Sequence, residues 1–296
     1  MNFENAQKIH FIGIGGIGVS ALAKMMHHHG VEISGSDLEG SEITDELSEL
    51  LNIDITIGSD TSKITKETNY VIYSPAVPVD DLEYLHAQKL YIPLISYPKA
   101  LGEISKKHTT IAIAGTNGKT TTTSLLLDAF NFSGLSPTVI IGGILQKYNS
   151  NYVAGDSKYF ITEACEYKRS FLNIHHDIAI ITNITEDHLD YFKDISDIQS
   201  AFIEFIENKK SSGVIICNKE LPKLQPILEY AQEHNVTIID YSSYIKLDYG
   251  QKIIGKHNKQ NAAAAIATID YLGFDVQKTV EYLGSHFSGT KRRLDF

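Results

Sequence analysis

The chain has 296 residues, 43% of them hydrophobic and 21% charged, a composition typical of a globular protein long enough for two domains. Its formal net charge of −10 argues against broad binding of the phosphate backbone of nucleic acid. No apolar run approaches the ~20 residues of a membrane span, the N-terminus lacks a cleavable-signal pattern, and the two cysteines have no metal or redox spacing. We therefore expect a cytoplasmic protein that has neither nucleic acid nor a membrane as a partner.

The first hundred residues alternate between strand and helix patterns. Residues 8–15 read as a strand, residues 17–30 as a helix and residues 31–37 as a second strand. A helix capped by Ser41 and three more strands follow, at residues 41–51, 53–58, 70–77 and 91–96. The alternation predicts a Rossmann-like parallel sheet in a first domain of residues 1–106.

A glycine-rich turn joins the first strand to the first helix. Its glycines, in the pattern G-x-G-x-x-G, are Gly13, Gly15, Gly16 and Gly18. Asp37 follows Gly18 by nineteen residues at the end of the next strand, where its carboxylate can bond a ribose. The pattern predicts a nucleoside diphosphate site. NAD is the default ligand, and a UDP-linked substrate would use the same helix N-terminus.

Ser74 ends a later strand of this series. It either supplies a second loop at the same sheet edge or forms a simple turn.

A second strand–helix series begins at residue 108, after a polar junction at residues 101–110. Its candidate strands are residues 111–115, 137–143, 159–165, 178–184, 212–218 and 236–240. We expect a P-loop-type α/β domain over residues 107–296.

The first strand of this series runs into a turn and a helix that we expect from Thr122 onward. The turn residues are Gly115, Thr116, Asn117, Gly118, Lys119, Thr120 and Thr121. Such a turn directs backbone N–H groups at an anion, Lys119 adds charge for the β- and γ-phosphates, and the Thr120 or Thr121 hydroxyl can ligate Mg²⁺. Ile113 stands where the usual spacing has Gly. We still favour a nucleoside triphosphate site over an ordinary turn with a surface lysine.

Two acidic segments close later strands. Glu163 offers the oxygen ligands that Mg²⁺ prefers. His188 is a less usual ligand, but it follows a strand that should lie near the phosphate loop. Asp187 and Asp190 are expected to be solvated or to support a ligand indirectly.

Two polar groups lie further along the chain. Asn258 precedes an alanine-rich helix and could approach a base or ribose, although Asn258 or Asn261 could also cap that helix. The basic cluster at residues 291–293 could hold phosphate or carboxylate, or belong to a linker.

Taken in order, these segments resemble the Mur ligases of peptidoglycan synthesis. The matching segments are residues 10–23, 34–37, 74–77, 111–124, 162–167, 182–192, 255–265 and 287–293. The resemblance implies an ATP-dependent ligase that activates the carboxylate of UDP-N-acetylmuramate as an acyl phosphate. The amine of L-alanine then displaces the phosphate and leaves an amide.

The resemblance also implies roles for residues in the second domain, with ATP and Mg²⁺ as cofactors. Gly118, Lys119 and Thr120 would hold the triphosphate, and Asn258 would approach the adenine. Mg²⁺ ligands would be Thr120 and Glu163 for one ion and His188 for a second, which makes Lys119, Glu163 and His188 the catalytic set.

In the first domain, the loop of residues 13–18, with Asp37 and Ser74, would hold the UDP substrate. Two departures stand beside this pattern. Asn117 replaces the His that members adding L-alanine commonly have, and residues 163–169 differ from the frequent family version, so Glu166 and Lys168 receive no role.

The family resemblance further implies a third, C-terminal domain that binds the amino acid and closes over ATP. The chain stops at Phe296, where that domain would begin. We expect the chain to bind UDP-N-acetylmuramate and ATP but to ligate poorly alone, unless a separate C-terminal domain or partner subunit completes it.

Three alternatives remain at this point. The chain could belong to a ligase that recycles muropeptides. It could be a non-catalytic UDP-sugar and ATP-binding protein or subunit. It could also be an NAD-dependent oxidoreductase, although such an enzyme has little use for a second, triphosphate-type site.

Overall fold

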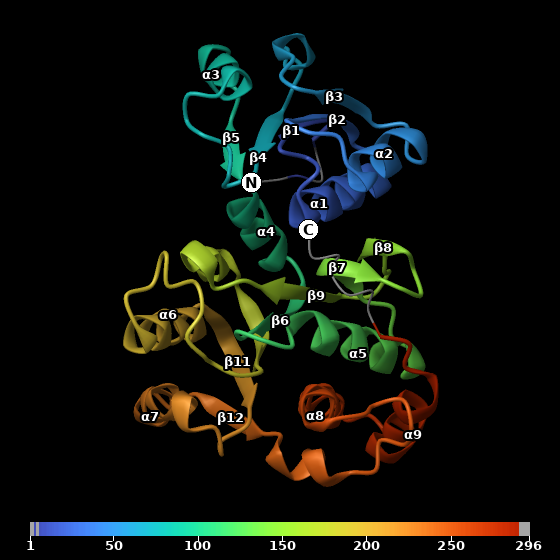
Figure 1. Ribbon diagram of the computed structural model, residues 1–296, viewed down its shortest axis with the longest axis vertical. Coiled ribbons are helices and arrows are strands. Elements are labelled where there is room, and N and C mark those ends of the chain that lie inside the picture. Colours follow the sequence, from blue (N-terminus) through green and yellow to red (C-terminus); the bar gives the residue numbers. More distant parts are fainter. Residues whose placement is uncertain (1–2, 4–5, 290–296) are drawn as a thin grey trace. The chain divides into compact units, whose positions relative to one another are not determined.

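Two separate β-sheets organise the chain (Figure 1). The computed structural model describes residue 3 and residues 6–289, so the basic cluster at 291–293 lies outside the described residues. The chain divides into Met1–Glu103 and Ile104–Phe296, which we call unit 1 and unit 2.

The sheet of unit 1 is parallel throughout, in the order β3-β2-β1-β4-β5. Its strands are β1 (Lys8–Ile12), β2 (Glu32–Asp37), β3 (Asp54–Ile57), β4 (Tyr70–Tyr73) and β5 (Leu94–Ser96). The chain moves outward from β1 to β3 and then crosses to β4 on the other side of β1. Ligands of such sheets bind at this reversal, beyond the carboxyl ends of the strands. The Rossmann-like parallel sheet is therefore confirmed.

In the described part of the chain, helices α1 (Ile17–His28), α2 (Glu42–Glu49) and α3 (Leu82–Lys89) lie between these strands, and α4 (Tyr97–Ser105) follows β5. The predicted cap of α2 is confirmed, since the Ser41 hydroxyl accepts from the Thr44 backbone N–H at 3.2 Å. The Thr44 hydroxyl accepts from the Ser41 N–H at 2.7 Å in return, which satisfies two N–H groups at the helix start.

The sheet of unit 2 has the order β12-β11-β10-β6-β9-β7-β8. Its strands are β6 (Thr109–Ala114), β7 (Thr138–Leu145), β8 (Ser150–Val153), β9 (Tyr159–Ala164), β10 (His176–Ile181), β11 (Lys209–Cys217) and β12 (Thr237–Asp240). All neighbouring pairs are parallel except β7 and β8. The sequence reading omitted β8, because this short antiparallel edge strand lacks an apolar run.

The α-helices in the described part of unit 2 are α5 (Lys119–Phe132), α6 (Ile195–Glu207), α7 (Gln225–Glu233), α8 (Lys256–Tyr271) and α9 (Val276–His286). Figure 1 shows α5, α8 and α9 grouped on one side of the sheet and α6 and α7 on the other. The alanines 262–265 of α8 are all fully buried, and such small side chains let α8 approach α5 closely. The expected P-loop-type α/β arrangement is confirmed.

Several predicted strands end earlier or begin elsewhere than expected, among them the first, which ends at Ile12 and not at residue 15. Two of the wrong boundaries bear on the phosphate loop. Helix α5 begins at Lys119 rather than at Thr122, because Gly118 adopts a left-handed conformation at φ 89° that turns the chain directly into the helix. Strand β10 ends at Ile181 instead of continuing to residue 184. Thr182 and Asn183 instead turn their polar groups toward the phosphate loop.

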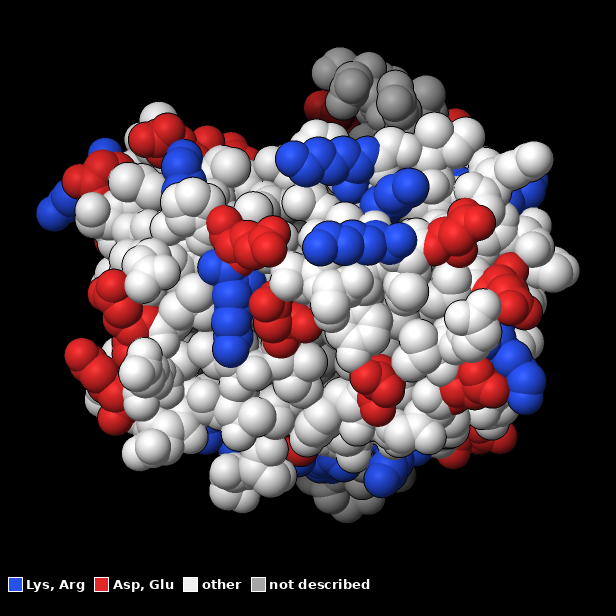
Figure 2. Space-filling model, turned by 90° about the horizontal axis from the view of Figure 1, so that it is seen from below, with Lys and Arg blue, Asp and Glu red and all other residues white. Residues whose placement is uncertain are grey.

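The face seen in Figure 2 carries acidic and basic side chains interspersed among neutral ones. Among the described residues, no helix combines the length and apolar character needed to cross a bilayer.

Candidate functional site

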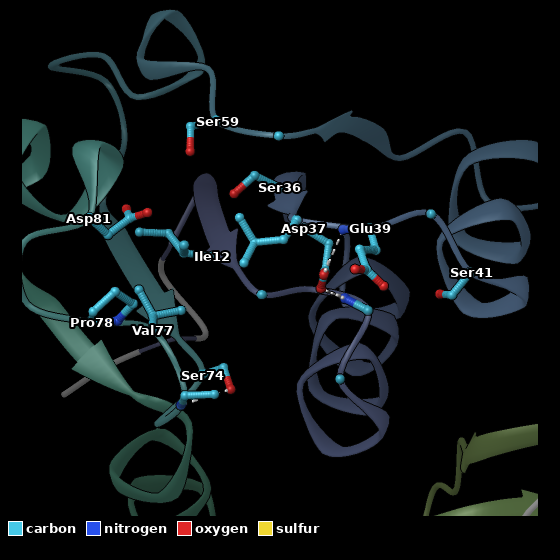
Figure 3. A pocket seen from close by; sticks show the side chains of 17 residues that line it. Ile12, Ser36, Asp37, Glu39, Ser41, Ser59, Ser74, Val77, Pro78 and Asp81 are labelled. Carbon is cyan, nitrogen blue, oxygen red and sulfur yellow. Dashed lines mark hydrogen bonds between the residues drawn. The ribbon is translucent and has the colours of Figure 1, made fainter. Parts of the chain in front are cut away.

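A cavity of about 470 Å³ opens at the carboxyl ends of the unit 1 strands, within the range of small-molecule pockets. In Figure 3 the residues that follow β4 face those that follow β2 across this cavity. The polar lining consists of Ser36, Asp37, Glu39, Ser41, Ser59, Ser74 and Asp81, with the glycine loop contributing Gly13, Gly15 and Gly16. The cavity thus lies at the sheet edge where the glycine motif predicted a diphosphate site.

Asp37 fixes the glycine loop in this structure. Its Oδ2 accepts a hydrogen bond from the Gly15 backbone N–H at 2.7 Å (Figure 3). A Cβ at Gly15 would lie 2.9 Å from the same oxygen, so the contact requires glycine. The other oxygen, Oδ1, is 3.5 Å from the Glu39 backbone nitrogen. That long contact leaves Oδ1 the better placed of the two oxygens for the expected ribose hydroxyl.

Ser74 fits both readings offered by the sequence. Its hydroxyl accepts from the Ala76 backbone N–H at 3.3 Å, as in a simple turn, and the residue also lines the cavity. Gly18 lies deeper, where a Cβ would come 2.6 Å from the Tyr97 hydroxyl oxygen. Gly18 therefore permits close packing against α4, whereas Gly13, Gly15 and Gly16 line the cavity.

The phosphate loop of unit 2 connects β6 to α5 and is held from the neighbouring strand. The backbone N–H of Thr116 donates to the Asn183 carbonyl at 3.0 Å, and that of Asn117 donates to the Asn183 side-chain oxygen at 3.0 Å. The Thr182 hydroxyl donates to the Asn117 carbonyl at 2.7 Å. Since β10 pairs directly with β6, the segment after β10 forms one wall of the loop.

The first turn of α5 contains Lys119, Thr120 and Thr121. Backbone N–H groups in the first turn of a helix have no partner within the helix, and together with the helix dipole they favour an anion. A Cβ at Gly118 would lie 2.4 Å from the Asn261 side-chain oxygen on α8, so this turn also requires glycine. The loop and helix start therefore have the geometry of an anion site.

Lys119 is folded back over its own loop. Its ammonium group donates to the carbonyls of Gly115 and Thr116 and lies 3.0 Å from Oε2 of Glu166. Glu166 is 3% exposed, so the carboxylate is shielded from water and its attraction to the ammonium group is weakly screened. This ion pair links the phosphate loop to the segment after β9.

Glu166 also belongs to a group with Asp187 and His188. One ligand atom from each of these residues lies within 4.8 Å of the others. The His188 ring packs on the ring of Tyr167, with centroids 4.7 Å apart, and the Tyr167 hydroxyl donates to Asp190 at 2.9 Å. Two carboxylates and an imidazole at this spacing could hold a divalent cation.

Glu163 lies at the carboxyl end of β9, beside Ile113 of β6. Its Oε1 accepts from the Gly142 backbone N–H at 2.9 Å, and a Cβ at the adjacent Gly143 would lie 3.1 Å from the Thr120 methyl carbon. Thr120 and Glu163 thus approach the same pair of glycines, Gly142 and Gly143, within β7. Glu163 is not a member of the group formed with His188.

Asn258 lies in the first turn of α8, and its side-chain amide donates to the Ile254 carbonyl at 3.0 Å. The cap of α8 is Gly255, so neither Asn258 nor Asn261 caps this helix. Asn261 is buried and packs against Gly118.

The sequence reading gave no role to Glu166 and treated Asp187 as solvated or supporting, and it did not connect Asn261 with the loop. Glu166 follows Glu163 by three residues, immediately beyond a strand that ends at the loop. That position could have indicated a role for Glu166. We assigned none, because the sequence around Glu166 departs from the family pattern.

The comparisons with known proteins cover both units. The "Mur ligase family, catalytic domain" matches residues 8–109, and the "Mur ligase middle domain" matches residues 113–251. A UDP-N-acetylmuramate–L-alanine ligase of Clostridium kluyveri is 38% identical over 99% of this chain and 69% of its own length. The corresponding ligase of Agathobacter rectalis is 36% identical over 100% of this chain and 70% of its length.

The chain is also similar to solved structures of UDP-N-acetylmuramate ligases. The UDP-N-acetylmuramate:L-alanyl-gamma-D-glutamyl-meso-diaminopimelate ligase from Neisseria meningitides matches with a TM-score of 0.83 at 26% identity, covering 97% of this chain and 100% of that chain. UDP-N-acetylmuramate-alanine ligase from Thermotoga maritima matches with a TM-score of 0.77 at 28% identity, covering 97% of this chain and 70% of that chain.

Proposed function

Because the chain belongs to the Mur ligase family, we propose that it provides the substrate sites of an ATP-dependent ligase of peptidoglycan precursor synthesis. UDP-N-acetylmuramate binds in the cavity of unit 1, and ATP binds at the phosphate loop of unit 2. L-alanine is the amino acid that is added, as in the relatives that are 36–38% identical to this chain over the aligned residues. Because ATP is held within cells, the proposed location is the cytoplasm.

One observation carries this proposal: Lys119 at the start of α5 is paired with Glu166, which belongs to a group with Asp187 and His188. A dinucleotide-dependent oxidoreductase needs the cavity of unit 1, but it has no use for a phosphate loop beside a cation-binding group. A ligase needs both, because it transfers the γ-phosphoryl group of ATP to a carboxylate.

The proposed reaction has two steps. A carboxylate oxygen of the muramate attacks the γ-phosphorus of ATP, the bond from that phosphorus to the bridging oxygen breaks, and ADP leaves. The amine nitrogen of L-alanine then attacks the acyl carbon, the bond to the phosphate oxygen breaks, and inorganic phosphate and one proton are released. The N–H groups of the loop and the Lys119 ammonium hold the negative charge of the transferring group and align it.

For the first step, Lys119 must exchange its carbonyl and Glu166 partners for phosphate oxygens. Three ammonium protons and a flexible stem allow that exchange. The side chains of Thr182 and Asn183 both donate to the Asn117 carbonyl. These bonds keep the backbone N–H groups of the loop in place while Lys119 changes partners.

We further propose Mg²⁺ as the cofactor, since the donor set is rich in the oxygens that this ion prefers. Glu166, Asp187 and His188 would form one set of ligands. Thr120 and Glu163 would form the other, and Asn258 would lie near the adenine. Bound Mg²⁺ would neutralise phosphate charge.

A second candidate is the recycling ligase, which would add a peptide in place of L-alanine. The TM-score of 0.83 with the Neisseria meningitides ligase favours it. The identities of 36–38% with L-alanine ligases favour the first candidate.

Release of ADP by the protein expressed from its complete gene tests the proposal. We expect release to require UDP-N-acetylmuramate and to be faster with L-alanine than with L-alanyl-γ-D-glutamyl-meso-diaminopimelate. The reverse preference would establish the recycling ligase. ATP hydrolysis that is indifferent to UDP-N-acetylmuramate would overturn both.

A further inference from the structure

A buried carboxylate lies behind the cavity of unit 1. Glu83, in the first turn of α3, is 0% exposed, and both of its oxygens are engaged. Oε1 accepts from the Asp60 backbone N–H at 2.7 Å, and Oε2 accepts from the Ser36 hydroxyl. Burying a carboxylate is costly unless its charge is balanced and its oxygens are bonded, so this arrangement needs an explanation.

His10, on β1, lies against this carboxylate. It is 0% exposed, and its Nε2 lies 3.6 Å from Oε2 of Glu83. The opposite nitrogen, Nδ1, is 2.9 Å from the Ser34 hydroxyl oxygen on β2. Glu83, His10 and the two serines therefore form one polar cluster that connects α3 to β1 and β2.

Glu83 is held in its charged form. Burial raises its pKa, but the His10 ring, the Ser36 hydroxyl and the Asp60 N–H together outweigh burial and leave the pKa below its usual value. The carboxylate thus acts as a hydrogen-bond acceptor and not as a donor. An acceptor with two oxygens can hold two separate segments at once.

Both segments that Glu83 holds are walls of the cavity. Ser36 lines the cavity at the end of β2. Asp60 directly follows Gly58 and Ser59, which line it after β3. The Glu83 backbone N–H also donates at 2.9 Å to Asp81, a lining residue of the opposite wall.

We propose that Glu83 is a positioning residue for the UDP-substrate site, which fixes Ser36 and the loop of residues 58–60 at the spacing the ligand requires. This inference rests on the proposed function. Glu83 touches no ligand itself and acts through the two segments. His10 packs against Oε2 of Glu83 from β1.

Calorimetric titration of UDP-N-acetylmuramate and, separately, of ATP with Mg²⁺ at 25 °C tests the proposal. Glu83→Gln keeps an acceptor for the Asp60 N–H but loses the acceptor for Ser36, and Glu83→Leu loses both. The loss of one or two hydrogen bonds predicts that Kd for UDP-N-acetylmuramate rises about 3-fold in the first variant and about 10-fold in the second. Kd for ATP, which binds in the other unit, should stay within a factor of about 2.

Glu46→Gln is the matched control. Glu46 is also an ion-paired glutamate of unit 1, 2.7 Å from the Lys24 ammonium nitrogen, but it does not line the cavity or contact its walls through Ser36 or Asp60. A residue that contributed only stability would lower the unfolding temperature and leave both Kd values unchanged.

The titrations distinguish failure of the proposed role of Glu83 from failure of the proposed function. If the wild-type protein does not bind UDP-N-acetylmuramate, the proposed function and this inference both fail. If the wild-type protein binds and Glu83→Gln binds as tightly as Glu46→Gln, only this inference fails. Should circular dichroism show that Glu83→Leu is unfolded, the comparison of the two Gln variants decides.

Discussion

The Lys119 ammonium nitrogen lies 3.0 Å from Oε2 of Glu166, a residue 47 positions further along the chain. This contact joins the phosphate loop to the group of Glu166, Asp187 and His188. A lysine that faces phosphate oxygens in one state and a carboxylate in another never leaves its charge unbalanced in a partly buried site. The pair therefore connects the two halves of the proposed ATP site.

Replacing Lys119 by Ala should weaken ATP binding and leave UDP-N-acetylmuramate binding unchanged. A charge-assisted hydrogen bond to phosphate contributes about 1.5–3 kcal/mol, so Kd for ATP should rise about 10- to 100-fold in a fluorescence titration. Lys278→Ala serves as the control, since Lys278 pairs with Asp275 on the exposed surface of α9. Equal effects of the two variants would count against the assignment of Lys119.

Glu166→Gln should raise the Mg²⁺ concentration needed for ATP binding. The substitution removes a carboxylate charge from the proposed ligand group while keeping its size, so we expect a shift of about 10-fold. Glu186→Gln is the control, because the Glu186 side chain is exposed and makes a long ion pair, with its carboxylate 3.8 Å from the Lys223 ammonium nitrogen. An unchanged Mg²⁺ dependence in Glu166→Gln would remove Glu166 from the ligand set.

Gly118 and Gly134 lie at opposite ends of α5. Replacing each by Ala distinguishes the cost of backbone strain from the cost of a steric clash. Gly118 and Gly134 both have positive φ, 89° and 75°, but only at Gly118 would a Cβ meet a neighbour within 4 Å. Gly134→Ala should cost about 1–2 kcal/mol of unfolding free energy from strain alone. Gly118→Ala should cost more and should also weaken ATP binding, because Asn261 must move. Similar urea midpoints and ATP affinities for the two variants would contradict this reading of the loop.

The stability of unit 2 should fall in mild acid because of His176. This residue is 0% exposed and its Nε2–H donates to the Phe205 carbonyl at 3.1 Å. Burial lowers its pKa to about 4. In the unfolded chain the imidazole takes up its proton near the ordinary value of about 6.5, so the unfolded state binds more protons between these two values. Stability from this group is therefore present above pH 6.5 and is lost as the pH falls toward 4.

Denaturant unfolding at pH 7 and pH 5 measures this loss. The contribution of His176 should amount to about 2 kcal/mol across that interval. His176→Gln keeps a donor for the Phe205 carbonyl but cannot titrate, so it should show a correspondingly smaller pH dependence than the wild-type protein. Identical slopes with pH in the two proteins would rule out His176 as the cause.

Much of the fold was readable because the signals were local. Strands of unit 1 are short apolar runs separated by helices, and the Ser41–Thr44 cap is contained within four residues. Strand β8 escaped detection because its pairing with β7, and not its own composition, makes it a strand.

The glycine motifs were readable for the same reason, since each lies within a single turn between a strand and a helix. The position of Glu166 could not be predicted from the sequence, because it depends on the turn that follows this residue. Lys168 and Arg169 both adopt left-handed backbone conformations, with φ of 50° and 54°, which sequence patterns do not anticipate for these residue types. Arg169 holds that turn by ion pairs with Asp197 and Glu204 of α6. These partners are distant in sequence, so no local pattern places Glu166 against Lys119.

We propose that one chain holds a UDP-substrate site and a separate ATP site. Calorimetric titration of the chain of residues 1–296 with UDP-N-acetylmuramate, and then with ATP and Mg²⁺, tests it most directly. We predict saturable binding of both ligands at once, with Lys119→Ala weakening only the binding of ATP. Binding of NAD in place of UDP-N-acetylmuramate, or mutual exclusion of the two ligands, would contradict the claim.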